Sequence, residues 1–268
     1  MCICSRDANL VGRPVDTAMI SKTIRREIAW AVVLALTCAS AIYAIFNAIK
    51  YEWNWPAIWE WRALVFRGWV VTLLLSLGAL VLSVVIGLVL MTGQRSPIVP
   101  VRLASRSFVE IIRGTPLLVQ LLIGYYGVAN ALHIDSSMLV GIVILAFFEG
   151  AYLAEIFRAA WESISASQLE AARAVGFSRV ETWRYVIFPQ AVRRALPGTA
   201  GQMVSLVKDS SLLSVIGIEE VTQRMRVAYS STYAALEGFI PLALLYLAIT
   251  LPLSWWARKL EERFKYET

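Results

Sequence analysis

Charged side chains interrupt two of the apolar stretches of this 268-residue sequence, and they are the first candidates for chemistry. Glu149 follows the apolar run ILAFF, and the pair Lys208-Asp209 lies within the segment 196–217. A charge inside the hydrocarbon core of a membrane is costly, so it usually faces a partner or a water-filled cavity. Glu149 is therefore a candidate for a substrate pathway. Lys208 and Asp209 belong either to such a pathway or to a structural network.

Two further pairs of opposite charge, Glu110–Arg113 and Glu155–Arg158, are spaced for one helical face. Their members are three residues apart, which predicts an ion pair in each case. Gly114-Thr115-Pro116 follows the first pair directly and should break or kink the helix there. Arg113 and these three residues form either a structural element near the inner membrane surface or part of a cytoplasmic gate.

The residues that metal or nucleophilic catalysis needs are scarce. His133 is the only histidine, so a histidine metal cluster or a Ser/His pair has little support. Cys2, Cys4 and Cys38 form no metal-binding spacing, and we interpret them as incidental thiols. We therefore expect no metal site and no catalytic residues in this chain.

A charged stretch between about 162 and 195 predicts two short helices joined by a glycine. Ser167 and Ser178 each begin an S-x-x-E pattern, which is typical of a helix-capping box. Gly176 should provide the turn between the two helices, and Pro189 should bring the second one to an end. From capping alone, this stretch could be an ordinary amphipathic connection under the membrane.

The elements that must position these residues are apolar helices. The sequence is 58% hydrophobic and only 16% charged, which is typical of an integral membrane protein. Six segments approach the roughly 20 apolar residues that cross a bilayer. They cover about 28–49, 67–92, 107–131, 138–160, 196–217 and 237–257. Between the first two, residues 51–66 hold four Trp and should lie on the outer surface as an amphipathic piece.

The distribution of Lys and Arg predicts the orientation. Most of the 25 basic residues fall in the N-terminal tail, the 93–106 connection, the 162–195 stretch and the C-terminal tail. Because Lys and Arg accumulate on the cytoplasmic side, both termini and the 162–195 stretch should be cytoplasmic. The net charge of +6 reflects this topology, and we expect no nucleic-acid partner.

The charged stretch resembles the EAA loop of ABC importer permeases. The pattern of this loop matches Glu170, Ala171, Ala172, Gly176, Val186, Phe188 and Pro189. Four more blocks are similar to polar amino-acid uptake permeases, in the same order: EIIRGTPLLVQLL, EGAYLAEIFR, PQAVRRALP and LVKDSSLLSVIG. The resemblance covers about 67–257. Ala166-Ser167-Gln168 and Ser210 depart from the usual residues, which leaves the exact ligand open.

The resemblance implies an all-α polytopic membrane protein with about six transmembrane helices and a five-helix MetI-like core. The core would span 67–257 and include the coupling loop 162–195. Around it we expect a cytoplasmic tail 1–27, an accessory helix 28–49, a periplasmic segment 50–66 and a tail 258–268. ATPase coupling would involve Glu170, Ala171, Ala172, Gly176 and Pro189. The pathway would involve Glu149, Tyr152, Lys208, Asp209 and Ser210, and the gate Arg113, Gly114, Thr115 and Pro116.

The implied machine is a binding-protein-dependent importer of a polar amino acid in the bacterial inner membrane. Its partners would be two ABC ATPase subunits, a second permease subunit and a periplasmic or lipid-anchored amino-acid-binding protein. ATP and Mg²⁺ would bind the ATPase subunits, because the sequence has no G-x-x-x-x-G-K-[ST] motif. Alternatives are an opine or sulfur-containing amino acid as cargo, an ion-gradient-driven transporter, or a membrane enzyme.

Overall fold

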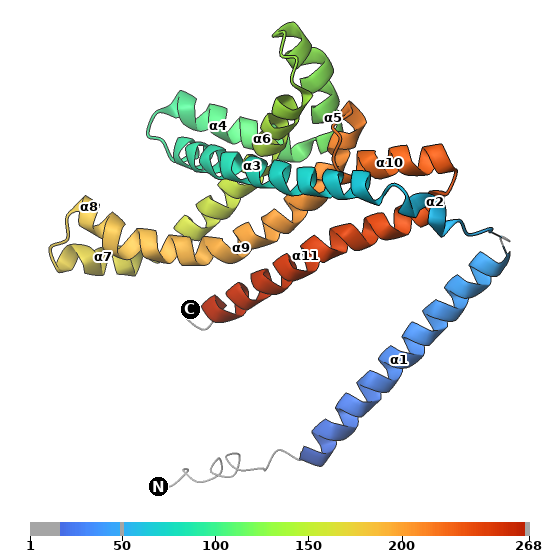
Figure 1. Ribbon diagram of the computed structural model, residues 1–268. Helices are drawn as coiled ribbons and strands as arrows, with labels where there is room; N and C mark the ends of the chain where they lie inside the picture. The colour runs from blue at the N-terminus through green and yellow to red at the C-terminus, as the bar shows by residue number, and fades with distance from the viewer. Residues whose placement is uncertain (1–16, 49–50, 266–268) are drawn as a thin grey trace. The chain divides into compact units, whose positions relative to one another are not determined.

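The computed structural model describes residues 17–48 and 51–265, and all of their regular structure is helical (Figure 1). The described chain forms two compact units that divide between Trp53 and Asn54. The predicted all-α fold class is confirmed for these residues. Cys2, Cys4 and most of the predicted tail 1–27 lie outside them.

The first unit contains one long helix, α1 (Thr17–Ala48). Residues Arg26–Asn47 of this helix are long and apolar enough to cross a membrane, which agrees with the predicted span 28–49. After α1, the ring of Trp53 packs against Phe46 at 5.5 Å and edge-on against Tyr51 at 5.1 Å. Aromatic residues at the end of a span are typical of the membrane–water interface.

The second unit holds the remaining helices. They are α2 (Trp55–Trp59), α3 (Arg62–Gln94), α4 (Val99–Gly114), α5 (Leu117–Leu122), the π-helix η1 (Ile123–Ala129), α6 (Ser137–Glu162), α7 (Ala166–Ala174), α8 (Arg179–Glu181), the π-helix η2 (Thr182–Ile187), α9 (Phe188–Asp209), the 3₁₀ helix η3 (Ser210–Ile216), α10 (Val221–Thr232) and α11 (Ala235–Lys265).

Helices α3 and α6 cross closely because each has a glycine at the contact. A Cβ atom at Gly150 would lie 2.7 Å from Ile86 Cγ2, and one at Gly87 would lie 2.9 Å from Leu153 Cβ. Small residues let two membrane helices approach until their backbones nearly touch. This crossing fixes α6, which carries Glu149 and Glu155, against α3.

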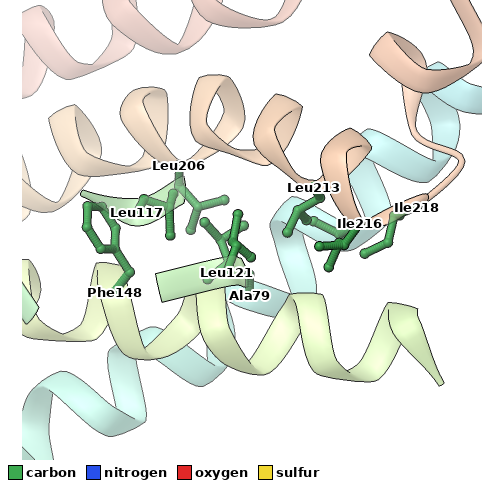
Figure 2. Packing of buried hydrophobic residues seen from close by; sticks show 10 residues of the cluster. Ala79, Leu117, Leu121, Phe148, Leu206, Leu213, Ile216 and Ile218 are labelled. Atoms are coloured by element: carbon green, nitrogen blue, oxygen red, sulfur yellow. The ribbon is translucent and has the colours of Figure 1, made fainter. Parts of the chain in front are cut away.

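A buried apolar cluster joins five helical segments (Figure 2). Leu117 and Leu121 of α5 insert between α6, which contributes Phe148, and α9, which contributes Leu206. The other members are Leu75, Ala79, Leu145, Leu213, Ile216 and Ile218. The cluster therefore ties the helices around Glu149 to those that carry Asp209.

The predicted span 107–131 is wrong as a single helix. The chain forms α4 and then α5 with η1, and the two parts meet at an angle of 109° at Gly114–Pro116. Thr115 is extended, with ψ of 145°, because a residue before proline is excluded from the helical region. The predicted break is confirmed, and it is sharp enough to turn the chain by more than a right angle.

The predicted end of a helix at Pro189 is also wrong. The chain stays helical from Arg179 through η2 to Asp209, and Pro189 lies in the first turn of α9. Proline lacks an N–H and crowds the preceding turn, but the wider π-helix η2 comes directly before it and accommodates both defects. The coupling stretch is therefore continuous with the helix that holds Asp209.

The other predicted spans agree with helices of matching position. Helices α3, α6 and α11, and the bent pair α4 with α5–η1, are long and apolar enough to cross a membrane. Helix α9, which holds most of the predicted span 196–217, is more polar and does not meet this criterion. Of the predicted amphipathic segment 51–66, residues 55–59 form the short helix α2 and residues 62–66 form the first part of α3.

Candidate functional site

Helices α7 and α8 form a hairpin at the end of the second unit opposite α10 (Figure 1). Gly176 forms the turn with φ of +90°, a conformation that glycine adopts readily. Gly176 N donates to Arg173 O, and Phe177 N donates to Ala172 O, both at 3.0 Å. This pair of bonds is a Schellman motif and closes α7. The predicted glycine turn is confirmed.

The second helix of the hairpin begins with the predicted capping box. Ser178 Oγ and Ser178 N donate to Glu181 Oε2 at 2.7 and 2.8 Å, and Glu181 N donates to Ser178 Oγ at 3.3 Å. The bonds from the Ser178 hydroxyl and then from its backbone N–H hold the pKa of Glu181 below its ordinary value. The cap is therefore strongest while Glu181 is ionised.

The predicted capping box at Ser167 is wrong. Helix α7 already begins at Ala166, after the N-cap residue Ser165, which makes no side-chain cap bond. Ser167 thus lies inside the helix, and its hydroxyl is 3.1 Å from that of Ser165. Glu170 is exposed and is free to meet another protein.

The remaining coupling residues do not all face outward. Ala171 is exposed, but Ala172 is buried within the unit, where its carbonyl accepts the Schellman bond. Close approach by a partner at residue 172 is therefore not possible without opening the hairpin. Instead, the side chains of Val175 and Val180 are 76% and 72% exposed near the turn. Unlike the helices of the membrane part, this hairpin exposes apolar residues beside many charged ones.

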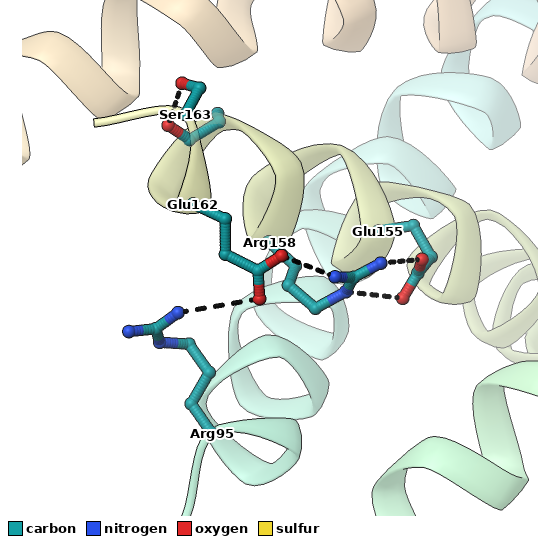
Figure 3. A network of polar contacts seen from close by, with 6 residues as sticks. Arg95, Glu155, Arg158, Glu162 and Ser163 are labelled. Carbon is teal, nitrogen blue, oxygen red and sulfur yellow. Dashed lines mark hydrogen bonds and ion pairs between the residues drawn. The ribbon is translucent and has the colours of Figure 1, made fainter. Parts of the chain in front are cut away.

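A chain of ion pairs runs along the predicted cytoplasmic end of α6 (Figure 3). Arg158 binds Glu155 with Nε–Oε1 and Nη2–Oε2 distances of 3.1 and 2.7 Å, as predicted. Its Nη1 also donates to Glu162 at 2.6 Å, and Arg95 lies 3.7 Å from Glu162. These residues connect the end of α3 to the end of α6.

Arg113 belongs to the same chain, and its predicted pairing with Glu110 is wrong. Its Nη1 is 3.5 Å from Glu155 Oε2, and its guanidinium carbon is 5.2 Å from the ring centroid of Tyr152. The sharp end of α4 brings Arg113 against α6, whose carboxylate and aromatic ring outcompete the neighbour on its own helix. Tyr152 also packs against Phe148 at 5.1 Å. The structure thus associates this predicted pathway residue with the predicted gate residue Arg113.

The break at Gly114–Pro116 is stabilised by a side chain that the sequence prediction missed. Gln120 Nε2 donates to Ile112 O at 2.7 Å, Thr115 O at 3.2 Å and Thr115 Oγ1 at 2.8 Å. These bonds satisfy backbone carbonyls that the break frees from helical pairing. A polar residue four positions after a proline inside an apolar run was the available signal.

The predicted pathway residues Glu149 and Asp209 come together in the membrane part. Glu149 is fully buried, and its Oε2 accepts a hydrogen bond of 2.5 Å from Gln202 of α9. Asp209, the last residue of α9, is near enough to interact electrostatically with Glu149 and with Lys208. Gln202 was missed, although it lies seven residues before Asp209 and so on the same helical face.

Lys208 and Ser210 are placed differently from this carboxylate pair. Lys208 is exposed on the surface of the unit, whereas Ser210 is fully buried. The Ser210 hydroxyl donates to Val207 O at 2.8 Å, a bond that serves the end of its own helix. Within the residues that the structure describes, no group of three or more His, Cys, Asp or Glu side chains could hold a metal ion.

The hairpin is joined to the ion-pair chain at its base. Arg194 Nη1 of α9 donates to Ser163 O at 2.6 Å and to Ser163 Oγ at 2.7 Å. Ser163 directly follows Glu162, the last residue of α6. A displacement of the hairpin would therefore act on the end of α6 and on the arginines paired there.

Comparison with known proteins places this arrangement among transport proteins. The model of the family described as binding-protein-dependent transport system inner membrane component matches residues 83–266. The glutamine transport system permease protein GlnP of Escherichia coli strain K12 is 38% identical over 217 residues, which are 80% of this chain and 99% of that protein.

Two further similarities extend the comparison. The histidine/lysine/arginine/ornithine transport system permease protein HisQ of Salmonella typhimurium is 32% identical over 204 residues, 72% of this chain and 90% of that protein. A crystal structure of an amino acid ABC transporter with histidines matches with a TM-score of 0.74 and 33% identity, and covers 80% of this chain and 100% of that one.

Proposed function

Because the chain belongs to the family of binding-protein-dependent transport system inner membrane components, we propose that it is the permease subunit of an ATP-driven importer for a polar amino acid. The observation that carries the proposal is the capped hairpin α7–α8 with its exposed apolar turn, in a chain whose helices α1, α3, α6 and α11 are long and apolar enough to cross a membrane. The names of GlnP and HisQ favour glutamine or a basic amino acid over an opine or a sulfur-containing amino acid.

The proposed partners follow from the family description and the hairpin. A binding protein delivers the amino acid to the outer face, and a second permease subunit completes the pathway. Two ATPase subunits, which bind ATP and Mg²⁺, dock on the cytoplasmic hairpins and close on ATP. The closure switches access across the inner membrane, and hydrolysis resets it. The cytoplasmic placement of both termini and of the hairpin is supported by the distribution of Lys and Arg.

The pathway we propose runs past Glu149, Gln202 and Asp209, because a fully buried carboxylate in a membrane helix usually serves a cavity or a partner. Helix α9 links this region to the hairpin without interruption. ATP-driven movement of the hairpin would therefore reach the pathway through one element. An ion-gradient-driven transporter would have no use for such a hairpin.

The experiment tests docking and cargo together. Val175→Asp combined with Val180→Asp places charges on the apolar turn, and Val227→Asp places one charge at an exposed residue of α10, at the opposite end of the unit. We expect the double variant to lose co-purification with the ATPase subunits and ATP-dependent uptake in proteoliposomes. The Val227→Asp control should retain both.

Uptake assays with the binding protein should show transport of L-glutamine or L-histidine that needs ATP. Transport that continues without ATP while an ion gradient is present would overturn the proposal. Unchanged assembly and uptake in the double variant would remove the hairpin from the coupling role.

A further inference from the structure

A polar cavity of about 390 Å³ lies between the end of α3, α4 and α6, apart from Glu149. Its polar lining consists of Gln94, Arg106, Glu110, Arg113, Glu155 and Arg158. Val109, which is 2% exposed, anchors the α4 wall in a second apolar cluster that it forms with Met91, Ala151 and Ala154. The volume is typical of sites for small ligands, but the charged lining disfavours an acyl chain or another apolar molecule.

The ion pairs at the cavity wall, together with Arg95 and Glu162 beside it, leave a positive charge uncompensated. Glu155 is shared by Arg113 and Arg158, and Glu162 is shared by Arg158 and Arg95. Three arginines thus share two carboxylates. Arg113 holds its carboxylate at only 3.5 Å and keeps 41% of its side chain exposed, so it can accept a second anionic partner.

Arg106 and Glu110 complete the wall with a separated cation and anion. They are four residues apart on α4, and within the described chain neither is assigned to an ion pair. Arg106, Glu110 and Arg113 follow at helical spacing, so one face of α4 presents both signs of charge. A ligand with one positive and one negative group would complement this face.

Gln94 supplies an unmet donor on the opposite wall. This residue is 3% exposed, and its Nε2 forms no hydrogen bond with any described residue, although it lies close enough to Glu155 to interact with it. A buried N–H group without an acceptor is unfavourable, so a ligand oxygen at this position would stabilise the site. The donor and the arginines together favour a carboxylate.

We propose that this cavity is a second amino-acid site, which binds the α-carboxylate of an amino acid through Gln94 and the arginines and its α-ammonium through Glu110. The proposal rests on the proposed function for the cargo class and for the cytoplasmic position of the cavity. Because the recognised groups belong to the amino-acid backbone, several polar amino acids should bind with similar affinity. Cargo that accumulates inside would occupy the site and slow further import.

The test uses the permease with its ATPase subunits in nanodiscs, without the binding protein, and calorimetric titration with L-glutamine and L-histidine. We expect both to bind. Decarboxylated glutamine and glutaramic acid, which lack the α-carboxylate and the α-ammonium respectively, should bind at least about tenfold more weakly. Binding should persist in a Glu149→Gln background, because that residue lies outside the cavity. Binding of inorganic phosphate in place of L-glutamine would overturn the proposal.

Matched variants test the residues. Arg106→Gln, Glu110→Gln and Gln94→Met should each weaken binding by about tenfold or more, whereas Arg106→Lys should retain most of it. Arg102→Gln is the control, since Arg102 bonds Ser96 O at 2.8 Å and does not line the cavity. A loss of binding in the control as great as in the other variants would overturn the assignment.

Proteoliposomes preloaded with L-glutamine separate this proposal from the proposed function. Preloading should slow uptake by the wild type and not by Glu110→Gln. Amino-acid uptake that is insensitive to preloading in both would refute the second site and leave the importer intact. Failure of every amino acid to be transported would refute the importer.

Discussion

The hydrogen bonds between Ser178 and Glu181 determine where the second helix of the coupling hairpin begins. The carboxylate accepts bonds from both donors of Ser178, which lowers the pKa of Glu181. A carboxyl group whose pKa is lower in the folded state stabilises that state at pH values above its unfolded pKa of about 4.3. The stabilisation is lost as the pH falls through the lower, folded pKa.

We expect Ser178→Ala to speed hydrogen exchange of the backbone amides of residues 179–182 severalfold at neutral pH, because the start of α8 loses its cap. In the wild type, the protection factors of these amides, corrected for the intrinsic pH dependence of exchange, should decrease when the pH falls below the unfolded pKa of Glu181. Glu181→Gln should abolish this acid-dependent loss. A wild type and a Glu181→Gln variant with the same acid response would contradict the assignment.

Glu149 and Lys208 are both charged residues within predicted membrane spans, but the structure places them in different environments. Glu149 is fully buried and hydrogen-bonded, and Lys208 is exposed on the unit. We expect Glu149→Gln to reduce uptake strongly, by about tenfold or more, because a neutral side chain alters the site shared with Asp209. Lys208→Met should also reduce uptake, because the proposed second permease subunit would cover this exposed residue in the assembled pathway.

Radiolabelled amino-acid uptake in proteoliposomes measures these effects. Glu60→Gln, which changes an exposed carboxylate next to α2, is the control and should transport normally. Normal uptake by both Glu149→Gln and Lys208→Met would remove these residues from the pathway.

At the scale of elements, the close crossing of α3 and α6 positions both the buried carboxylate and the ion-pair chain. Gly150→Ala adds a Cβ atom that would lie 2.7 Å from Ile86 Cγ2 and 3.3 Å from Ser83 O. We expect a loss of about 1–3 kcal/mol in stability, since the packed helices must move apart. Gly127→Ala is the matched control, because nothing lies within 4 Å of its Cβ position.

Denaturation in detergent micelles, followed by circular dichroism, measures the difference. The Gly127→Ala variant should be at least as stable to denaturation as the wild type, because alanine favours a helix more than glycine does. Equal stability of the two variants would show that α3 and α6 can separate at this crossing without cost.

The helices and the hairpin were largely predictable, because they depend on local patterns. Apolar length indicated four of the six predicted spans as single helices and a fifth as the bent pair α4 with α5–η1, and Gly176 and the Ser178 box indicated the hairpin. The error at Pro189 has a physical cause: whether a proline ends a helix depends on the turn before it, and no residue type specifies a π-helix. The partners of Arg113 and Glu149 depend on which helices touch, so their pairing with Glu155 and Gln202 required the structure.

At the scale of the whole molecule, the proposed orientation makes opposite ends accessible from opposite sides. The hairpin residue Ser178 should be cytoplasmic, and Tyr233, which is 92% exposed after α10, should be periplasmic. After replacement of Cys2, Cys4 and Cys38 by serine, a single cysteine at either position can be labelled with an impermeant maleimide.

We expect the cysteine at residue 233 to react in intact spheroplasts and the one at residue 178 to react only after lysis. The opposite result would invert the orientation, and with it the assignment of the hairpin to the ATPase side. Labelling of both positions in intact spheroplasts would show that the two ends share one side.

The helical continuity from Arg179 to Asp209 has a mechanical consequence. A helix of this length extends roughly 45 Å, so the segment acts as a lever with the hairpin at one end and Asp209 at the other, and Pro197 lies inside it. A small tilt imposed at the hairpin becomes a displacement of several ångströms at the far end, around a fulcrum where α9 crosses its neighbours. The π-helix before Pro189 lies within this segment. If the helix bends there, the displacement at Asp209 is smaller than a straight helix would give.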